Sequence, residues 1–265
     1  MDTHAVLQDA IAIAQAGGKI ALSYFRKPLK METKASSIDI VTEADKAVEL
    51  YIAEEILKRY PEHHLVGEEG GGQGAASETA EYFWYVDPID GTTNFANGIP
   101  YFSVSIALTD ANRCPLAGVV YDVTRDDVYA AIQGQGATFN GKPLQVSQTS
   151  ELINSVLVTG FPYDRTTSPD NNLKEWSAFI VQTRSVRCLG SAALDLAYVA
   201  AGRVDGYWER GINSWDVLAG MLLVEESGGK VTDYAGNDTP QNKPDKRYLA
   251  SNGHLHATMI DILQA

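Results

Sequence analysis

Four strand-like segments in close succession constrain the fold of this chain more than any other feature of its sequence. They read YFWYV (82–86), YFSVSIALT (101–109), PLAGVVYDV (115–123) and DVYAAI (127–132). Each is rich in β-branched and aromatic residues, and Gly, Asn and Asp mark the turns between them. Consecutive strands joined by short turns pair with each other in an antiparallel arrangement, so the sequence predicts a largely antiparallel sheet in this region.

Helices and further strands on both sides of this region predict a layered α/β fold. Residues 3–26 carry apolar residues at helical spacing, and Thr42 opens a second helix that Pro61 ends. Strands and helices alternate again in the second half, which implies a second sheet-forming region. We expect residues 1–265 to form one domain. Its two tightly joined halves are expected at about 1–150 and 151–265.

The other predicted elements follow from the same patterns of apolar and turn residues. Strands are predicted at 153–160, 185–189, 204–208, 230–234 and 248–252, and helices near 170–183, at 191–203, at 215–229 and from His254 onward. A loop is predicted at 30–39 and a flexible glycine-rich connection at 70–79.

The charge of the chain limits its partners. The chain has 265 residues, a formal net charge of −13 and a sequence pI of about 4.7. An acidic surface repels polyanions, so we expect no nucleic-acid partner and no binding to anionic membranes. The charge is compatible with a site that gathers divalent cations, and also with solubility alone.

Cysteine content and hydropathy predict a cytoplasmic protein. Cys114 and Cys188 lie far apart without C-x-x-C spacing, so the sequence suggests neither a disulfide framework nor a zinc site. The first residues lack the basic region and the continuous apolar region of a signal peptide. No apolar stretch approaches the roughly 18 residues that a membrane-spanning helix needs.

The segment VDPIDGTTNF (86–95) places two acids directly after the first strand-like run. Asp87 and Asp90 offer the oxygen ligands that Mg²⁺ prefers, and the backbone carbonyl of Ile89 lies between them. Gly91 removes a side chain where the backbone has to pass close to another group. An ordinary Asx-type turn would explain the same residue types.

Hydroxyl groups and further acids accompany this segment. Thr92 and Thr93 offer amides and hydroxyls of the kind that hold a phosphate or orient a water molecule. Glu68 and Glu69 follow another apolar segment, and Asp216 follows a tryptophan in SWDVLAG. Acids at three turns flanked by apolar residues are more than a solvated surface needs, and they favour a divalent-cation site.

The combination of GEE (67–69), DPIDGTTNF (87–95) and WDVLAG (215–220) resembles the inositol monophosphatase family of Mg²⁺-dependent, lithium-sensitive phosphatases. The resemblance covers nearly the whole chain, including TEAD (42–45) and GSAALDL (190–196). It implies a five-layer αβαβα sandwich of the sugar-phosphatase type and a homodimer. It also implies a hydrolase of small phosphate monoesters, with myo-inositol monophosphate as the expected substrate. Two to three Mg²⁺ ions per subunit and inhibition by Li⁺ are implied as well.

The resemblance implies a set of metal ligands in this sequence. Glu68, Asp87 and the carbonyl of Ile89 match the ligands of a first metal ion, and Asp87, Asp90 and Asp216 match those of a second. Glu68 would also face a weakly held third ion. In such sites one ion lowers the pKa of an attacking water, and another stabilises the leaving alkoxide.

The resemblance also implies catalytic residues. Thr92, assisted by Asp45, matches the hydroxyl that orients the attacking water, and Glu68 is the third member of the expected catalytic set. Asp45 has a competing explanation, because Thr42 and Asp45 are spaced as a helix capping box. Lys34 lies where the family places a lysine near the metals, although a solvated loop lysine would look the same.

Substrate contacts are implied on both sides of the expected site. Gly91 and Thr92 would contact the phosphate through their amides. A carboxylate that accepts from two neighbouring hydroxyls would select a polyol, which is the role that Glu209 matches. Ser191 is also a natural helix N-cap, and Glu209 also fits a strand-end surface acid paired with Arg210. The remaining substrate-binding residues implied by the resemblance are Gly190, Ser191, Ala192 and Asp216.

The identity of the substrate stays open at this point. Arg184, Arg187 and Arg210 either pair with surface acids or favour a more highly charged phosphate. The family also contains histidinol-phosphate phosphatases and enzymes that act on fructose 1,6-bisphosphate. An alternative of another class is a binding or regulatory protein in which the acids hold a structural cation without turnover.

Two motifs resemble functional sites and are interpreted as structural. Residues 136–142 match the first seven positions of a P-loop, but Pro143 replaces the required Ser or Thr, so Asn140–Gly141 is predicted as a turn. The histidine pairs 63/64 and 254/256 lack a clear third ligand and are interpreted as surface residues.

Overall fold

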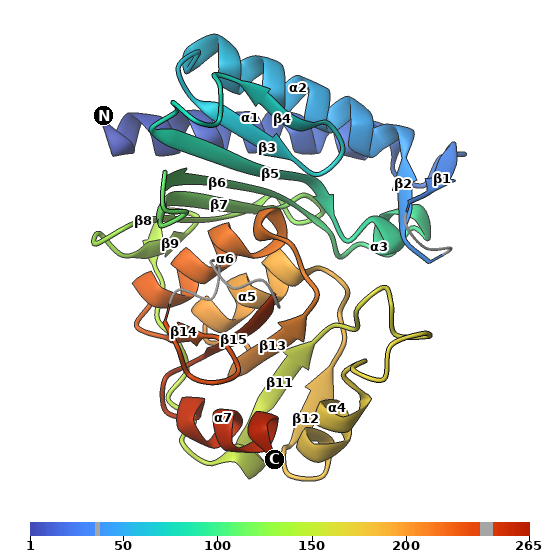
Figure 1. The fold of residues 1–265 in the computed structure, drawn as a ribbon, viewed down its shortest axis with the longest axis vertical. Helices are drawn as coiled ribbons and strands as arrows, with labels where there is room; N and C mark the ends of the chain where they lie inside the picture. Colours follow the sequence, from blue (N-terminus) through green and yellow to red (C-terminus); the bar gives the residue numbers. More distant parts are fainter. Residues whose placement is uncertain (35–37, 239–245) are drawn as a thin grey trace.

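The computed structural model describes residues 1–34, 38–238 and 246–265, and these residues form five stacked layers (Figure 1). Two long helices lie on one face of a large sheet, two buried helices fill the space between this sheet and a second sheet, and two short helices cover the far side. This arrangement confirms the predicted αβαβα sandwich. The helices, in layer order, are α1 (Thr3–Tyr24) and α2 (Glu43–Arg59), α5 (Ala192–Ala200) and α6 (Ser214–Glu226), and α4 (Leu173–Ile180) and α7 (His256–Gln264).

Eight of the described strands form the larger sheet. Their order across the sheet is β10-β9-β8-β7-β6-β5-β3-β4, and all neighbours are antiparallel except β3 and β5. The four central strands are those predicted from the sequence, with the expected antiparallel pairing. The strands are β3 (His64–Gly67), β4 (Gly71–Gly74), β5 (Tyr82–Asp90), β6 (Ser103–Asp110), β7 (Pro115–Asp122), β8 (Asp127–Ile132), β9 (Ala137–Phe139) and β10 (Lys142–Pro143).

The smaller sheet has five of the described strands, in the order β12-β11-β13-β15-β14. Strand β11 pairs in parallel with both β12 and β13, whereas β15 is antiparallel to β13 and β14. Each strand matches a segment predicted for the second half. They are β11 (Val156–Thr159), β12 (Ser185–Arg187), β13 (Gly206–Arg210), β14 (Lys230–Thr232) and β15 (Arg247–Ser251).

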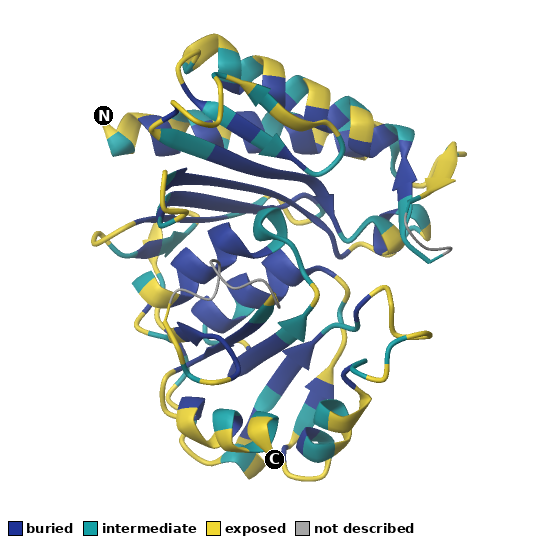
Figure 2. Ribbon diagram, viewed as in Figure 1, coloured by how far each residue is buried: buried dark blue, intermediate teal, exposed yellow. Residues whose placement is uncertain are grey.

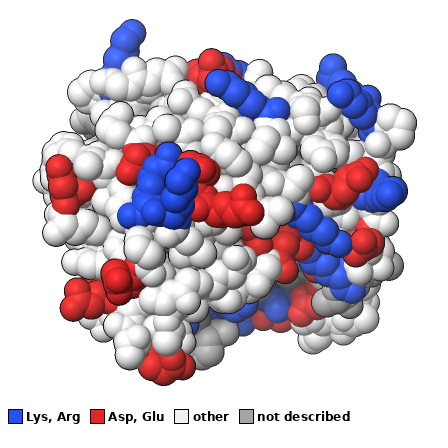
Figure 3. Space-filling model, turned by 90° about the horizontal axis from the view of Figure 1, so that it is seen from above, with Lys and Arg blue, Asp and Glu red and all other residues white. Residues whose placement is uncertain are grey.

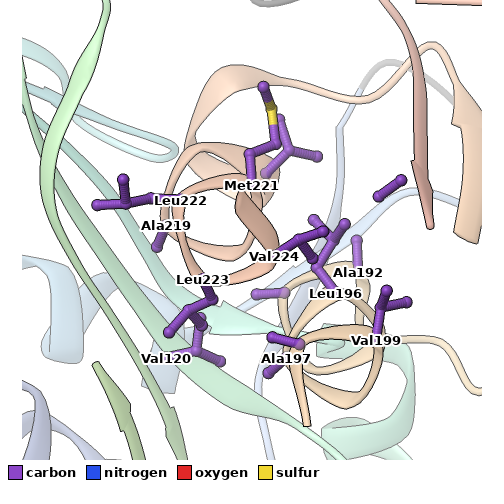
Figure 4. Close-up of a cluster of buried hydrophobic side chains, with 14 of the residues drawn as sticks. Val120, Ala192, Leu196, Ala197, Val199, Ala219, Met221, Leu222, Leu223 and Val224 are labelled. Atoms are coloured by element: carbon purple, nitrogen blue, oxygen red, sulfur yellow. The ribbon is translucent and has the colours of Figure 1, made fainter. Parts of the chain in front are cut away.

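The middle layer is buried on all sides, as Figure 2 shows for α5 and α6. A helix that is apolar around its whole circumference has to be covered on every face, and these two helices pack between the two sheets. Leu196 of α5 lies against Gly220 of α6, where a Cβ would meet Leu196 Cβ at 2.5 Å. The close approach of the helices therefore depends on glycine at this position. Figure 4 shows the apolar side chains around this contact.

Helix α2 begins as the sequence predicts. The Thr42 hydroxyl accepts from the Ala44 amide at 3.2 Å, and Asp45 Oδ2 accepts from the Thr42 amide at 2.8 Å. These bonds satisfy amides that the first turn of a helix leaves without partners. The helix ends at Arg59, before Pro61. The cap fixes the direction of the first turn, which carries Asp45 toward the site described below.

Two loop predictions were wrong in part. Within 30–39, Met31–Thr33 forms strand β1, which pairs with β2 (Ile40–Thr42) in a small hairpin, while residues 35–37 of this predicted loop lie outside the described residues. Within 70–79, Gly71–Gly74 forms edge strand β4. Neither segment has an apolar pattern, because both strands are short and lie at exposed edges, so backbone pairing alone defines them.

The interpretation of the histidines was also wrong in part. The side chains of His63 and His256 are buried. Trp84 Nε1 donates to His63 Nδ1 at 3.0 Å, and His256 lies between the hydroxyls of Thr232 and Ser251. Hydrogen bonds to neighbouring side chains, rather than exposure, therefore account for these two rings.

Residues 136–142, which match the start of a P-loop motif, contain a hairpin turn, as predicted. Asn140 and Gly141 have φ values of 49° and 75° and join β9 to β10. Positive φ at both central residues is typical of a tight hairpin turn.

The surface carries charges of both signs. On the face over α1 and α2, acidic and basic side chains are interspersed (Figure 3). None of the helices in the described part of the chain is both long and apolar enough to cross a lipid bilayer.

Candidate active site

A pocket of about 620 Å³ lies between the two halves of the molecule. Its first wall comes from the ends of β3 and β5 and from the short helix α3 (Thr92–Ala96). Its second wall comes from residues 160–165, the start of α5, the end of β13 and the start of α6. The segments that the sequence singled out, although more than 100 residues apart in places, therefore converge on one cavity.

Three carboxylates meet at the base of this pocket. Oxygens of Glu68, Asp87 and Asp216 all lie within 4.8 Å of one another. Strands β3 and β5 are parallel, with Gly67 opposite Val86, so the residues that follow these two positions emerge side by side. Asp216 joins them from the first turn of α6. We call Glu68, Asp87 and Asp216 the acidic trio.

The acidic trio has the chemistry of a site for a hard divalent cation. Burial raises the pKa of Asp87 well above its usual range, and the nearby charges of Glu68 and Asp90 raise it further. Burial and the charge of Glu68 do the same to the pKa of Asp216. Three buried or half-buried carboxylates in mutual contact repel one another unless a cation neutralises them, and carboxylate oxygens are the ligands that Mg²⁺ prefers. The donor set therefore fits such an ion.

Each aspartate of the acidic trio also has a local structural role. Asp87 Oδ1 accepts from the Ile89 amide at 3.0 Å, which is the Asx turn considered as an alternative. Asp216 Oδ2 accepts from the Asn213 amide at 2.7 Å and caps α6. These bonds orient the two side chains toward the pocket. Each uses one carboxylate oxygen and leaves the other oxygen facing the pocket.

Asp45 and Thr92 form a hydrogen-bonded pair at the edge of the acidic trio. The Thr92 hydroxyl lies 3.0 Å from Asp45 Oδ1 and 3.1 Å from the carbonyl oxygen of Ile89, and either can accept its proton. Asp45 Oδ2 is taken up by the helix cap at Thr42. The two explanations of Asp45 are therefore compatible, because each carboxylate oxygen serves one of them. Burial raises the pKa of Asp45, although the bonds from Thr42 and Thr92 oppose that shift.

Gly91 lies where the two walls come closest. Its φ is 99°, and a Cβ there would lie 2.9 Å from the carbonyl oxygen of Gly190. Both the positive φ and the close contact exclude larger residues. The expectation that the backbone passes close to another group at Gly91 is confirmed, and the group is the opposite wall of the pocket.

The structure places Asp90 beside the acidic trio rather than within it. Asp90 Oδ1 accepts from the Ala192 amide at 3.1 Å, and Oδ2 accepts from the Ala193 amide at 2.9 Å and from the hydroxyls of Ser191 and Ser103. A carboxylate at a helix N-terminus satisfies amides that lack partners within the helix. Burial raises the pKa of Asp90 to about 6 in spite of these bonds. Its assignment as a metal ligand remains a prediction.

Ser191 occupies the N-cap position of α5, but its hydroxyl donates to Asp90 instead of accepting from its own helix. The cap is therefore supplied by a residue of β5, about 100 positions earlier in the sequence. This contact holds the start of α5, and with it Gly190 and Ala192, against the first wall.

Glu209 faces the pocket from the second wall. Its Oε2 accepts from the Tyr207 hydroxyl at 2.9 Å, and its carboxylate fills the space over Gly160, where any Cβ would overlap it. Burial raises the pKa of Glu209 to about 7. Glu209 is thus not paired with Arg210. Arg210 lies instead 3.5 Å from Asp164 and 3.4 Å from Asp170.

The three arginines differ in their contacts. Arg210 pairs with Asp164 and Asp170, in keeping with the predicted pairing with acids. For Arg184 and Arg187, the bonds found among the described residues go to neutral groups, the side chain of Asn154 for the former and Ser185 and Val186 for the latter. Of the three, Arg210 is the one that lines the pocket.

Lys34 was named from the resemblance, whereas sequence reasoning missed Asn94. Lys34 Nζ lies 2.7 Å from Glu68 Oε1 and 2.5 Å from Glu69 Oε1, which agrees with its predicted position near the acids and adds Glu69 as a partner. Asn94 Nδ2 donates to the carbonyl oxygens of Tyr101 and Leu189, both at 2.8 Å, and so joins the two walls. Only the fold brings these groups together, and their spacing in the sequence gives no signal.

Glu49 is the exception, because a signal was present. It is buried in α2 among apolar residues of the same helix face, one turn after Asp45. An acid within an apolar stripe needs a buried partner. The partners are the backbone amides of Glu69 and Gly70, at 2.8 Å and 2.5 Å.

Comparisons with known proteins give matches over nearly the whole chain. The model of the Inositol monophosphatase family matches residues 2–265. An inositol-1-monophosphatase from Synechocystis is 43% identical over 254 residues, which cover 96% of this chain and 86% of the relative. A protein named Nus factor SuhB from Pasteurella multocida is 43% identical over 96% of this chain and 90% of its own length. The solved structure of an inositol monophosphatase from Anabaena (Nostoc) superposes with a TM-score of 0.88 at 43% identity, covering 100% of this chain and 97% of the other.

Proposed function

The chain belongs to the inositol monophosphatase family, and from this premise we propose that it hydrolyses myo-inositol monophosphate to myo-inositol and phosphate with the help of Mg²⁺. The observation that carries the proposal is the acidic trio beside the Thr92–Asp45 pair, in one pocket with Glu209. A site for cations, a proton acceptor and a hydroxyl-binding carboxylate are the three parts that this reaction needs.

The metal ligands in this proposal are Glu68, Asp87, Asp216, Asp90 and the carbonyl oxygen of Ile89. The first three are supported by their mutual contacts. Asp90 and Ile89 are supported by their position in the wall of the same pocket. When bound, Mg²⁺ would neutralise the phosphate, activate the attacking water and stabilise the leaving alkoxide.

Thr92 and Asp45 supply the path for the proton of the attacking water. With its own proton donated to Asp45 Oδ1, the Thr92 hydroxyl can accept a proton from a water molecule placed over the phosphorus. As the water oxygen forms its bond to phosphorus and the ester P–O bond breaks, the proton of the water passes to Thr92, and that of Thr92 passes to Asp45. The leaving inositol oxygen takes a proton from solvent. Glu68, the third predicted catalytic residue, stands beside this path in the acidic trio.

The substrate would lie between the two walls. The amides of Gly91 and Thr92 are available to a phosphate at the start of α3, on the first wall. The start of α5 at Gly190, Ser191 and Ala192 faces the same cavity, and Glu209 on β13 can accept hydrogen bonds from two adjacent ring hydroxyls.

Further properties of the family belong to the same proposal. We expect two to three Mg²⁺ ions per subunit, inhibition by Li⁺, a homodimer and a cytoplasmic location.

A second candidate function rests on the similarity to the Nus factor from P. multocida. This relative supports a regulatory binding role for the chain, with or without turnover. The close approach of Thr92 and Asp45 favours the enzyme, because a protein that only binds has no need for a proton path beside its cation site.

A panel of phosphate esters tests the proposal. Inositol 1-phosphate, histidinol phosphate, fructose 1,6-bisphosphate and a nucleotide monophosphate would each be assayed for phosphate release with Mg²⁺, with a chelator, and with Mg²⁺ plus Li⁺. We expect the inositol ester to be preferred and its hydrolysis to be lost with the chelator and reduced by Li⁺. Preference for another ester would refute the substrate and keep the chemistry. No phosphate release from any ester would favour the regulatory role.

A further inference from the structure

We propose that Glu49 is a positioning residue that holds the loop carrying Glu68 in the geometry required to bind Mg²⁺. This inference rests on the proposed function and adds to it a residue that does not itself line the pocket. Glu49 belongs to helix α2, whereas Glu68 follows strand β3 on the neighbouring sheet. The link between them is a set of backbone hydrogen bonds.

The loop after β3 directs three successive amides to fixed acceptors. The Glu68 amide donates to the carbonyl oxygen of Val86 at 3.2 Å, which continues the pairing of β3 with β5. The Glu69 amide donates to Glu49 Oε2 at 2.8 Å, and the Gly70 amide donates to Glu49 Oε1 at 2.5 Å. Both carboxylate oxygens of Glu49 are therefore used, one for each amide. The backbone on either side of Glu68 cannot shift without breaking one of these bonds.

Two glycines make room for this contact. A Cβ at Gly67 would lie 2.6 Å from the carboxyl carbon of Glu49, and one at Gly70 would lie 2.8 Å from its Oε1. Neither glycine has a φ in the left-handed region, so conformation alone does not require glycine at these positions. The Glu49 carboxylate occupies the space that a side chain at Gly67 would need, and at Gly70 it shares this role with Gln73, whose Nε2 would lie 2.7 Å from an added Cβ.

A carboxylate suits this task better than any neutral side chain. It offers two equivalent acceptors and no donor, which matches two amides that point in the same direction. Glutamine would keep one acceptor but would direct its NH₂ group at the second amide. Because Glu49 is buried, the amide left without a partner would lose its hydrogen bond without gaining one from water.

Helix α2 thereby connects two parts of the proposed mechanism. Asp45 and Glu49 are four residues apart and lie on the same face of the helix. Asp45 contacts Thr92, and Glu49 holds the loop of Glu68, so one helical turn sets the distance between the proton path and a metal ligand. Residues that orient metal ligands typically change metal affinity or activity by about 10–100-fold when they are replaced.

The experiment compares Glu49→Gln with Glu54→Gln, an exposed acid on the same helix that serves as matched control. Mg²⁺ binding is measured by titration calorimetry on the purified protein, and inositol 1-phosphate hydrolysis is measured against Mg²⁺ concentration. We expect Glu49→Gln to weaken Mg²⁺ binding about tenfold and to recover most of its activity at saturating Mg²⁺. We expect Glu54→Gln to match the wild type in both measurements. Unchanged Mg²⁺ affinity in Glu49→Gln would overturn the inference, even if its melting temperature in chelator fell.

Gly67→Ala provides a second route in case Glu49→Gln does not fold. It keeps the charge of Glu49 and displaces its carboxylate, so Mg²⁺ affinity should again fall about tenfold. The double variant should bind Mg²⁺ no more weakly than either single variant, because both break the same contact. Additive losses would contradict the inference. A wild-type protein that neither binds Mg²⁺ nor releases phosphate would overturn the proposed function and the inference with it, whereas an active wild type with an unaffected Glu49→Gln would overturn the inference alone.

Discussion

The two buried acids of helix α2, Asp45 and Glu49, and the two aspartates of the acidic trio lie in adjacent parts of the molecule, and the protein stabilises their carboxylates in different ways. Glu68, the third member of the trio, is paired with Lys34. Asp45 and Glu49 accept hydrogen bonds with both of their carboxylate oxygens, from Thr42 and Thr92 in one case and from two backbone amides in the other. Among the described residues, Asp87 and Asp216 each accept from one backbone amide, and the other close neighbours that act on them are carboxylates.

This difference separates acids that hold other protein groups in position from acids that bind a cation. A buried carboxylate with protein donors on both oxygens is compensated in part, although burial still raises the pKa of both Asp45 and Glu49, and its loss leaves donors without partners. A buried carboxylate among other carboxylates is compensated only when a cation arrives. The comparison predicts that replacing an acid of each group will change stability in opposite directions while lowering activity in both cases.

The largest effect is expected for Asp87→Asn. Removing a shared ligand of the acidic trio should lower phosphate release on the order of 1,000-fold, because several kcal/mol of charge stabilisation depend on the ions. In the presence of a chelator the same variant should be more stable than the wild type, because it removes one repelling carboxylate from a buried cluster. Steady-state assays and denaturant unfolding measure the two effects.

Mg²⁺ itself serves as the control for Asp87→Asn. Wild-type protein should gain about 2.7 kcal/mol of stability at an Mg²⁺ concentration 100 times its Kd, and the variant should gain much less. If Asp87→Asn is instead less stable than the wild type in chelator, the acidic trio is compensated within the protein and the contrast with helix α2 is wrong.

Asp45→Asn should have a smaller effect on rate and the opposite effect on stability. Loss of the proton acceptor behind Thr92 is expected to lower kcat about 100-fold, in the range typical of general base catalysis. An amide can accept with one atom only, so the helix cap or the Thr92 contact loses its acceptor, at a cost of about 1 kcal/mol. Mg²⁺ affinity should stay within about threefold of the wild type, since Asp45 is not part of the acidic trio.

Thr92→Val tests the same path from its other end. It removes the hydroxyl and keeps the shape, so it should lower kcat by a factor similar to that of Asp45→Asn, and the two changes together should cost no more than either alone. A fully additive double variant would show that Asp45 and Thr92 do not act as a unit.

Local patterns in the sequence predicted a layered α/β fold and the acids of the site, whereas the five-layer arrangement was implied by the family resemblance. The run 82–86 is apolar and Asp87 follows it, so the strand and its first acid could be predicted together, but the strand itself continues to Asp90 and contains both acids. Strands β1 and β4 escaped prediction because they have no apolar face, and only pairing with a neighbour makes them strands.

Contacts between the halves could not be predicted from the sequence. Asp90 caps α5 across about 100 residues, and Asn94 joins Tyr101 to Leu189 across a similar distance. No periodicity records such pairs, because each side chain would suit many partners. Glu49 differs from them, since a charged residue within an apolar helical face shows from the sequence alone that a buried donor is needed.

A smaller effect than those of the Asp87, Asp45 and Thr92 variants is expected for the pH dependence of the stability of the metal-free protein. Burial raises the pKa of Asp90 to about 6 and that of Glu209 to about 7, and it raises those of Asp87 and Asp216 well above their usual range. Between about pH 4, where these groups titrate in an unfolded chain, and these higher values, the folded protein binds more protons than the unfolded chain. Stability in chelator should therefore fall as pH rises from 5 to 7.5.

Saturating Mg²⁺ should flatten this profile, because it removes the preference of the folded state for protonated acids. Unfolding curves in chelator and in Mg²⁺ at several pH values measure the difference. A metal-free protein that becomes more stable over this pH range would show that the acids at the pocket are paired with cationic groups, and the comparison with helix α2 would then fail.

The smallest expected effect is the change in KM when Glu209, on the second wall, is replaced. Glu209 shares features with the acids of helix α2 and with those of the acidic trio. Tyr207 donates to its Oε2, yet burial still raises its pKa to about 7. If Glu209 accepts from ring hydroxyls, only its ionised form accepts with both oxygens, so KM for inositol 1-phosphate should fall as pH rises from 6 to 8, by less than tenfold. Glu209→Gln should raise KM about tenfold at pH 8, in keeping with a hydrogen bond to a charged group, and should abolish this part of the pH dependence.

Hydrolysis of a generic aryl phosphate gives the internal control, since an aryl group offers Glu209 no pair of hydroxyls. A similar rise of KM for both esters would mean that Glu209 supports the shape of the pocket, like the acids of helix α2, and does not select a polyol.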